Sequence, residues 1–255
     1  MKISVVTVCY NAAATIGEAL ESVVGQRGVD VEAIVIDGGS KDGTQEIIEG
    51  YRSQLAHFVS EADRGIYSAM NKGLAAATGD FIGFLNADDV FASPNCLSAV
   101  AQAAQTTGAA VIAGSVSQVN ANGREVRVIR GAEFKPDDLW YGGFPPHPAT
   151  YVKASLARKV GEFDETIPTA SDFDYFLRLR RDSQFSLATI DQILVSMRRG
   201  GASSSGLRSY LNISQDMIRA LRKQTPAVPV MRVYLRAFKK AKQFRVAATP
   251  VANDE

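Results

Sequence analysis

Residues 31–44 read Val31-Glu32-Ala33-Ile34-Val35-Ile36-Asp37-Gly38-Gly39-Ser40-Lys41-Asp42-Gly43-Thr44. The apolar run that opens this stretch is rich in β-branched side chains, which predicts a buried strand. Asp37 ends the run, and Gly38-Gly39 predicts a tight turn. Ser40 is a favourable N-cap for a helix over residues 42–52. A buried strand that leads through a polar turn into a helix predicts an α/β fold.

The same alternation of strands and helices continues on both sides of this stretch. Short apolar segments predict strands, and segments with a period of 3.6 residues predict helices. The expected strands cover residues 3–10, 57–60 and 81–85, and the expected helices cover 15–24, 66–77 and 94–107. Such alternation is typical of a mostly parallel, doubly wound sheet, in which ligands bind beyond the carboxyl ends of the strands.

The pattern changes after residue 110. Asn120-Ala121-Asn122-Gly123 separates two apolar runs, 111–119 and 125–130, which predicts a β-hairpin. The Gly/Ser-rich patch 200–206 is typical of a loop. The other elements expected here are a helix over 171–181, strands over 185–189 and 193–197, and helices over 210–223 and 230–246.

Composition excludes several classes of protein. The chain has 255 residues with 28 basic and 27 acidic side chains, a balance that argues against a nucleic-acid binder dominated by phosphate contacts. Two cysteines, Cys9 and Cys96, form no disulfide framework and favour a reducing compartment. The first ten residues read as a buried strand rather than a signal peptide, and no apolar segment is long enough to span a bilayer.

Carboxylates follow the predicted strands at what should be one edge of the sheet. Asp37, Asp63 and the pair Asp88-Asp89 lie there. Clustered carboxylates repel one another unless a cation compensates them, and Mg²⁺ or Mn²⁺ prefers oxygen ligands. Asn86-Ala87-Asp88-Asp89 therefore suits a metal-bridged diphosphate. Taken alone, the tetrapeptide more often marks a turn, because Asn and Asp also end strands for local reasons.

Four motifs follow one another in order: residues 5–11, 35–44, 63–73 and 79–89. Together they resemble the family-2 glycosyltransferases, which have the GT-A fold and invert at the anomeric carbon. This resemblance implies a Rossmann-like, mostly parallel α/β sheet flanked by helices, a smaller mixed part on the acceptor side, and a C-terminal helical tail. The implied catalytic domain covers 1–205, with a nucleotide-sugar-binding half over 1–110 and an acceptor-side half over 111–205, and 206–255 forms C-terminal helices and tail.

The resemblance also implies a donor site and a metal site. The residues implied to contact the nucleotide-sugar are Thr7, Tyr10, Asn11, Asp37, Asp63, Arg64, Asn71, Lys72, Asn86, Ala87 and Asp88. Asn86-Ala87-Asp88 stands where the family has its Asp-any-Asp metal motif. Because Asn replaces the first acid, Mn²⁺ or Mg²⁺ would fall to Asp88, with Asn86 or Asp89 assisting.

The implied base is Asp172. Residues 170–178 resemble the family's late acidic motif, and a carboxylate within reach of the acceptor hydroxyl can remove its proton. Asp174 is the rival, and either acid could instead stabilise a helix N-terminus. The chain departs from the family pattern at Ser171, where Glu is usual.

Two further groups are implied near the acceptor or the diphosphate. His147 matches a loop histidine of the family, and its alternative is an ordinary solvated histidine. Arg198 and Arg199 precede the Gly/Ser-rich patch, where they would either meet the diphosphate from a lid or belong to a solvated turn.

The function implied is transfer of a sugar from a nucleotide-diphosphate-sugar to an acceptor hydroxyl on a saccharide or lipid-linked saccharide, with UDP-sugars favoured over GDP- or dTDP-sugars. The reaction is expected to be one metal-assisted displacement with inversion. A nicotinamide oxidoreductase lacks its Gly-x-Gly-x-x-Gly here, and a phosphate-loop nucleotidase lacks Gly-Lys-Ser/Thr. A nucleotidyltransferase lacks its Gly- and Arg-rich signature. Only activity separates a non-catalytic nucleotide-sugar-binding protein from the enzyme.

Residues 230–246 place apolar side chains at helical spacing among basic ones. Such a helix binds an anionic membrane as a peripheral contact, or it packs on its own domain or on a second protomer of a homodimer. We expect a cytoplasmic protein of polysaccharide or cell-envelope synthesis, at the inner face of the cytoplasmic membrane if the helix binds lipid.

Overall fold

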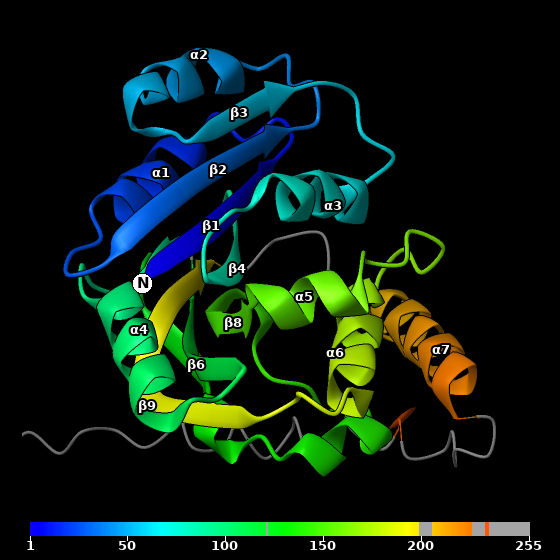
Figure 1. Cartoon of the computed structure of the whole chain (residues 1–255). Helices are drawn as coiled ribbons and strands as arrows, with labels where there is room; N and C mark the ends of the chain where they lie inside the picture. The colour runs from blue at the N-terminus through cyan, green and yellow to red at the C-terminus, as the bar shows by residue number, and fades with distance from the viewer. Residues whose placement is uncertain (121, 199–205, 226–232, 235–255) are drawn as a thin grey trace, which may run out of the picture.

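The computed structural model describes residues 1–120, 122–198, 206–225 and 233–234 (Figure 1). The strands are β1 (Lys2–Cys9), β2 (Asp30–Asp37), β3 (His57–Ser60), β4 (Phe81–Asn86), β5 (Asp89–Phe91), β6 (Val111–Val119), β7 (Glu125–Ile129), β8 (Thr150–Lys153) and β9 (Leu187–Arg198). The α-helices are α1 (Ile16–Val24), α2 (Thr44–Glu49), α3 (Ile66–Ala76), α4 (Cys96–Thr107), α5 (Ala154–Val160), α6 (Ser171–Arg181) and α7 (Gly206–Gln224).

These strands form one nine-stranded sheet in the order β3-β2-β1-β4-β8-β6-β9-β5, with β7 paired to β6 outside that order. Strands β3, β2, β1 and β4 are parallel neighbours. Beyond β4 the pairing is mixed, because β8 and β7 run antiparallel to β6 while β9 runs parallel to it. The predicted α/β fold, with a parallel first half and a mixed second half, is confirmed.

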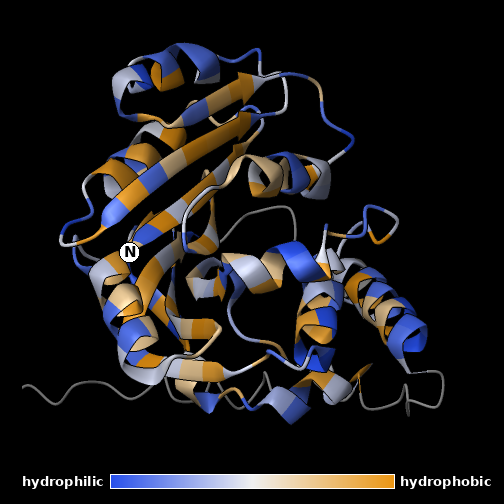
Figure 2. Ribbon diagram, in the orientation of Figure 1, coloured by the Kyte–Doolittle hydropathy of each residue, from blue (hydrophilic) through white to orange (hydrophobic). Residues whose placement is uncertain are grey.

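Both faces of β1, β2 and β4 are buried, and successive side chains of each strand point to opposite faces. Val6 and Val8 of β1 belong to the core beneath α3, whereas Ile3 and Val5 belong to the core beneath α1 and α4. Figure 2 shows the same pattern, with hydrophobic strands inside and hydrophilic helix surfaces outside. The carboxyl ends of these strands are therefore the open edge of the sheet.

Several local expectations were wrong. The two strands expected over 185–189 and 193–197 are the single strand β9, whose pairing with β6 shifts register and so absorbs the polar residues between them. Ser40 is not a helix N-cap, since its hydroxyl donates to Asp37 and α2 begins only after Gly43. Strand β5 was not expected, because three residues form a strand only through their pairing with β9.

Helix α7 packs against α6 and buries Met217 and Leu221 in the same core as α3. The Gly/Ser-rich patch, except for Gly206 at the start of α7, and most of the basic segment 230–246 lie outside the described residues. Of that segment, Val233 is buried in this core, and the backbone carbonyl of Tyr234 accepts a hydrogen bond from the Tyr210 hydroxyl at 2.9 Å. Cys9 and Cys96 are free thiols. Among the described helices, none has the length and apolar character needed to cross a bilayer.

Candidate active site

A cleft of about 1180 Å³ opens at the carboxyl ends of β1 and β4. Its walls come from both halves of the sheet and from α3, α6 and α7, which Figure 1 shows around this edge. The structure brings nine of the predicted site residues to its lining: Tyr10, Asn11, Asp63, Asn86, Ala87, Asp88, Asp89, Asp172 and Arg198. The predicted residues that do not line it are Thr7, Asp37, Arg64, Asn71, Lys72 and His147. Arg199 lies outside the described residues.

The end of β1 supplies an exposed aromatic ring and a strained backbone. Tyr10 is 67% exposed, and Asn11 has a φ of 48°, a left-handed conformation that asparagine tolerates better than most residues. The N–H of Asn11 donates to Ser40 Oγ at 2.7 Å, and its Oδ1 accepts from the N–H of Lys41 at 3.0 Å. A Cβ at Gly38 would lie 3.3 Å from the Tyr10 ring, so glycine leaves this corner open.

Asp37 is a structural residue of the turn after β2. It is fully buried and accepts hydrogen bonds from the backbone N–H groups of Gly39 and Ser40 and from the hydroxyls of Ser40 and Ser60. Burial raises the pKa of Asp37, but these hydrogen bonds outweigh it and hold the pKa below its ordinary value. Its predicted contact with the nucleotide stays a prediction, because its carboxylate is occupied by the turn.

Asp63 lies at the cleft in the loop before α3, with its side chain 8% exposed. Its carboxylate pairs with the Lys72 ammonium, which also contacts Glu61 at 2.8 Å. Burial lowers the pKa of Lys72, but these carboxylates raise it above its ordinary value, so the lysine stays charged. Arg64 points elsewhere and pairs with Glu165 at 3.0 Å, with its side chain 82% exposed.

Asn71 and Thr7 are buried and do not line the cleft. The Asn71 side chain donates to the backbone carbonyl of Phe163 at 3.0 Å and accepts from the N–H of Phe163 at 2.7 Å. Thr7 is buried within β1. Asn71 therefore holds α3 to the segment before α6, and the predicted contacts of both residues with the nucleotide stay predictions.

The Asn86-Ala87-Asp88-Asp89 segment joins β4 to β5 at the cleft. Asn86 Nδ2 donates to Asp89 Oδ2 at 2.9 Å, whereas the buried Asp89 Oδ1 accepts no hydrogen bond from the part of the chain that the structure describes. Burial and the charge of Asp88 raise the pKa of Asp89 to about 7. No group of three or more His, Cys, Asp or Glu side chains is arranged for a metal among the described residues. The buried, unpartnered oxygen beside Asp88 nevertheless fits a hard cation whose other ligands are phosphate or water oxygens.

Arg198 ends β9 next to this segment, because Asp89 pairs with Met197 across the β5–β9 ladder. Its charge lowers the pKa of Asp89 and so opposes the effect of Asp88. The Arg198 guanidinium forms an ion pair with Glu18 of α1. Arg198, whose guanidinium is predicted to contact a diphosphate, thus lies beside the predicted metal ligands.

Asp172 and its rival Asp174 lie in the first turn of α6 and point in different directions. Asp172 lines the cleft, and its Oδ1 accepts the N–H of Phe173 at 2.8 Å and the hydroxyl of Tyr67 at 3.2 Å. Asp174 is buried away from the cleft lining and pairs with Arg178 at 2.8 Å. Of the two acids, Asp172 alone is open to a ligand in the cleft.

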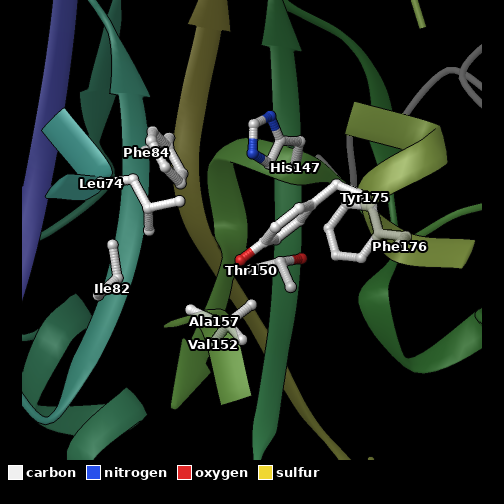
Figure 3. Close-up of a pocket in the computed structure, with 9 residues that line it drawn as sticks. All are labelled: Leu74, Ile82, Phe84, His147, Thr150, Val152, Ala157, Tyr175 and Phe176. Atoms are coloured by element: carbon white, nitrogen blue, oxygen red, sulfur yellow. The ribbon is translucent and has the colours of Figure 1, made fainter. Parts of the chain in front are cut away.

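His147 lies in an aromatic cluster. Its ring centroid is 5.3 Å from that of Phe84 and 5.9 Å from those of Phe163 and Phe176. Figure 3 shows it beside Phe84 and Phe176 at a small cavity of about 10 Å³. Burial lowers its pKa, and the charge of Asp172 opposes this only in part, so the imidazole is neutral. Its predicted contact with the acceptor or diphosphate stays a prediction.

The family model described as glycosyl transferase family 2 matches residues 4–159. The chain belongs to this family. It is also 34% identical over 183 residues to an uncharacterised glycosyltransferase of Mycobacterium tuberculosis, covering 69% of this chain and 68% of that relative. The chain is therefore a glycosyltransferase. Asp172, α6 and α7 lie beyond the residues that the family model matches.

Solved glycosyltransferase structures share the fold. TarS of S. aureus in complex with UDP-GlcNAc superposes with a TM-score of 0.66 at 18% identity, covering 98% of this chain and 76% of that chain. In another TarS structure this chain spans 40% of the longer TarS chain. Glucosyl-3-phosphoglycerate synthase of M. tuberculosis, in complex with Mn²⁺, UDP and phosphoglyceric acid, gives a TM-score of 0.58 at 19% identity, covering 87% of this chain and 78% of that one.

Several residues that line the glycosyltransferase cleft belong to none of the sequence motifs and were not predicted. Six lining residues that the sequence did not single out are Gln118 and Arg127 from the β6–β7 hairpin, Phe144, Thr169, and Ile213 and Met217 from α7. They are scattered over a hundred residues and meet only through the sheet and the α6–α7 packing. Their only sequence signals were the hairpin and the apolar stripe of α7. Tyr67 lies within the motif over residues 63–73, but nothing in the sequence indicated that its hydroxyl would donate to Asp172.

Proposed function

We propose that this glycosyltransferase moves a sugar from a nucleotide-diphosphate-sugar to an acceptor hydroxyl in one inverting displacement assisted by Mn²⁺ or Mg²⁺. One observation carries the proposal. Asp88, at the end of β4 in the parallel half, and Asp172, in the first turn of α6, line the same cleft. A cation ligand and a candidate base therefore share one solvent space, which a single displacement requires.

The donor nucleotide would lie at the carboxyl end of β1. The exposed Tyr10 ring, the open corner at Gly38 and the polar side chains of Asn11 and Asp63 offer both an aromatic surface and hydrogen-bonding groups to a base and ribose. Contacts with the nucleotide hold the reacting sugar in place. We favour UDP over GDP or dTDP, and the UDP complexes of TarS and of the phosphoglycerate synthase support that choice.

Asp88 and Asp89, with Asn86 assisting, would hold the cation. When bound, a divalent cation neutralises the negative charge that builds on the leaving diphosphate. Arg198 would add positive charge at the same place, since it ends β9 beside Asp89. The Mn²⁺ in the phosphoglycerate synthase structure supports a divalent cation in proteins of this fold.

Asp172 would accept the proton of the acceptor hydroxyl. As that oxygen bonds to the anomeric carbon, the bond from the carbon to the diphosphate breaks and the proton moves to the carboxylate. We place the acceptor, a saccharide or lipid-linked saccharide, beside Phe144, Phe173 and Ile213, because these apolar side chains line the cleft near Asp172. If residues 230–246 bind anionic lipid, the reaction takes place at the cytoplasmic membrane surface.

Nucleotide release from a panel of sugar donors tests this function, with Mn²⁺, with Mg²⁺ and with a chelator. Asp88→Ala and Asp172→Asn are each expected to lose activity by about 10²- to 10⁴-fold. Asp191→Asn is the matched control, because Asp191 is 78% exposed on β9 and lies away from the cleft. Wild-type rates in both cleft variants would refute the site, and rates unaffected by the chelator would refute the metal.

A further inference from the structure

The Asp172 carboxylate is held by only one of its two oxygens. Oδ1 accepts the hydroxyl of Tyr67 at 3.2 Å and the N–H of Phe173 at 2.8 Å. Among the described residues, no donor reaches Oδ2. Because a carboxylate has two equivalent oxygens and a soft terminal torsion, two donors on one oxygen select the oxygen that remains free.

Tyr67 is held on a rigid element. Tyr67 and Asn71 lie one turn apart on the same face of α3. The Tyr67 ring stacks on Phe163 with centroids 5.9 Å apart and planes 24° apart, and Asn71 bonds both backbone groups of Phe163. This face of α3 is thus fixed to the segment that leads into α6.

The opposite side of α3 is fixed on the sheet. A Cβ added at Gly73 would lie 2.1 Å from Val6 Cγ1, so glycine is required for α3 to lie this close to β1. The position of the Tyr67 hydroxyl is therefore set by packing at both faces of the helix, independently of any ligand.

Tyr67 does not line the cleft, so it reaches a ligand only through Asp172. Burial, together with the charge of Asp172, raises the pKa of the Tyr67 phenol well above its ordinary value. The phenol therefore keeps its proton and acts as a donor, which excludes a role as a second base.

We propose that Tyr67 is a positioning residue that holds Asp172 through Oδ1 and thereby presents Oδ2 to the acceptor hydroxyl. The inference rests on the proposed function, in which Asp172 receives the acceptor proton. In that step the O–H bond of the acceptor breaks, its oxygen bonds to the anomeric carbon, the nucleoside diphosphate leaves, and the proton ends on Oδ2. Tyr67 keeps its own proton throughout.

Tyr67→Phe tests the proposal, because it removes the hydroxyl and keeps the ring on Phe163. We expect kcat for transfer to fall about 10- to 100-fold, since a hydrogen bond to a charged group orients the base. The KM for the donor, the affinity for UDP and the melting temperature should stay near wild type. Tyr175→Phe is the matched control, because Tyr175 also stacks on Phe163, with ring centroids 4.5 Å apart, and its hydroxyl bonds no described residue.

A double variant separates positioning from a merely structural role. In the Asp172→Asn background, Tyr67→Phe should cause no further loss of kcat, because both changes remove the same function. Wild-type kcat in Tyr67→Phe, an equal loss in Tyr175→Phe, or a fully additive loss in the double variant would each overturn the proposal. If Asp172→Asn itself kept full activity, the proposed function would fail instead, so the two failures are distinguishable.

Discussion

At the amino ends of the parallel strands, Glu32 of β2 lies buried and accepts hydrogen bonds from Ser4 at 2.6 Å and from the N–H of Thr78 at 2.7 Å. At their carboxyl ends, Asp89 is more deeply buried, but its Oδ1 accepts no hydrogen bond from the described residues, and Asp88 is its neighbour in sequence. The first carboxylate closes the fold at one edge. The second has an unpaired oxygen at the edge where the cleft opens.

The pKa values of the two carboxyls shift in opposite directions, although burial raises both. Burial raises the pKa of Glu32, but the hydrogen bonds from Ser4 and Thr78 and the charge of Lys2 outweigh it and lower the pKa to about 2. For Asp89, burial and the Asp88 charge act together, and the pKa is raised to about 7. Buried acids in one sheet can thus be told apart by their hydrogen-bond donors, and the poorly satisfied one lies at the edge where we propose the active site.

The largest effect is expected from Glu32→Gln, which tests whether the hydrogen-bonded Glu32 carboxylate stabilises the fold. We expect a loss of about 3 kcal/mol in the free energy of unfolding at pH 7, from the drop in pKa between the unfolded value of 4.5 and the folded value of about 2. Because the folded pKa is depressed, this stability is present above pH 4.5 and is lost as the pH falls through 2. Denaturant unfolding of wild type and variant between pH 7 and pH 3 measures it.

The control for that variant is Asp88→Ala, which lies at the other edge. Its free energy of unfolding should stay within about 0.5 kcal/mol of wild type, because Asp88 is partly exposed and a partly exposed acid to which no described residue donates contributes little. Glu32→Gln should in turn keep the wild-type kcat/KM. A loss of activity in Glu32→Gln without a loss of stability would contradict the assignment of stability to the amino ends of the strands and of activity to their carboxyl ends.

Asn71→Ala is expected to give the next largest effect, and it separates the structural role of Asn71 in α3 from its predicted contact with the nucleotide. The change leaves the buried N–H and carbonyl of Phe163 without their partner, which should cost about 2 kcal/mol of stability. If Asn71 also contacts the nucleotide, as the family resemblance implies, the KM for the donor rises as well. Thermal unfolding and donor titration on the same samples separate the two roles. An unchanged melting temperature would contradict the stabilising role of the Asn71–Phe163 hydrogen bonds.

Glu18→Gln should have the smallest effect. The Glu18–Arg198 pair is exposed on both sides, and such pairs contribute less than about 1 kcal/mol. Stability should therefore hardly change. If Arg198 meets the diphosphate, its release from Glu18 lowers the KM for the donor by about two- to threefold, and Glu18→Asp restores the wild-type value. A higher KM would mean that Glu18 holds Arg198 in the binding position.

The parallel half could be predicted closely, because its signals are local. The continuous apolar run of β1, the Gly-rich turns and the helix periodicity each lie within about ten residues, and the four motifs fall on the strand ends. Strands β5 and β8 and the continuity of β9 could not be predicted. A three-residue strand has no periodicity of its own and exists only through its partner.

The site shows the same limit. Sequence motifs located Tyr10, Asn11, Asp63 and the Asn86–Asp89 segment, all of which line the cleft. The same motifs included Asp37 and Asn71, whose side chains the structure occupies with turn and loop contacts. A motif records which residues occur together, whereas hydrogen bonds decide which of them remain available to a ligand.

The sequence by itself determined the strand–helix alternation, the placement of acids at strand ends and the family, because each depends on residues close together in the chain. Only the tertiary structure decided that Asp172 and not Asp174 opens to the cleft, and that Tyr67 of α3 reaches it. This is because the direction in which each side chain points depends on the packing between α3, α6 and the sheet. Those contacts join residues about a hundred positions apart, and no local pattern encodes them.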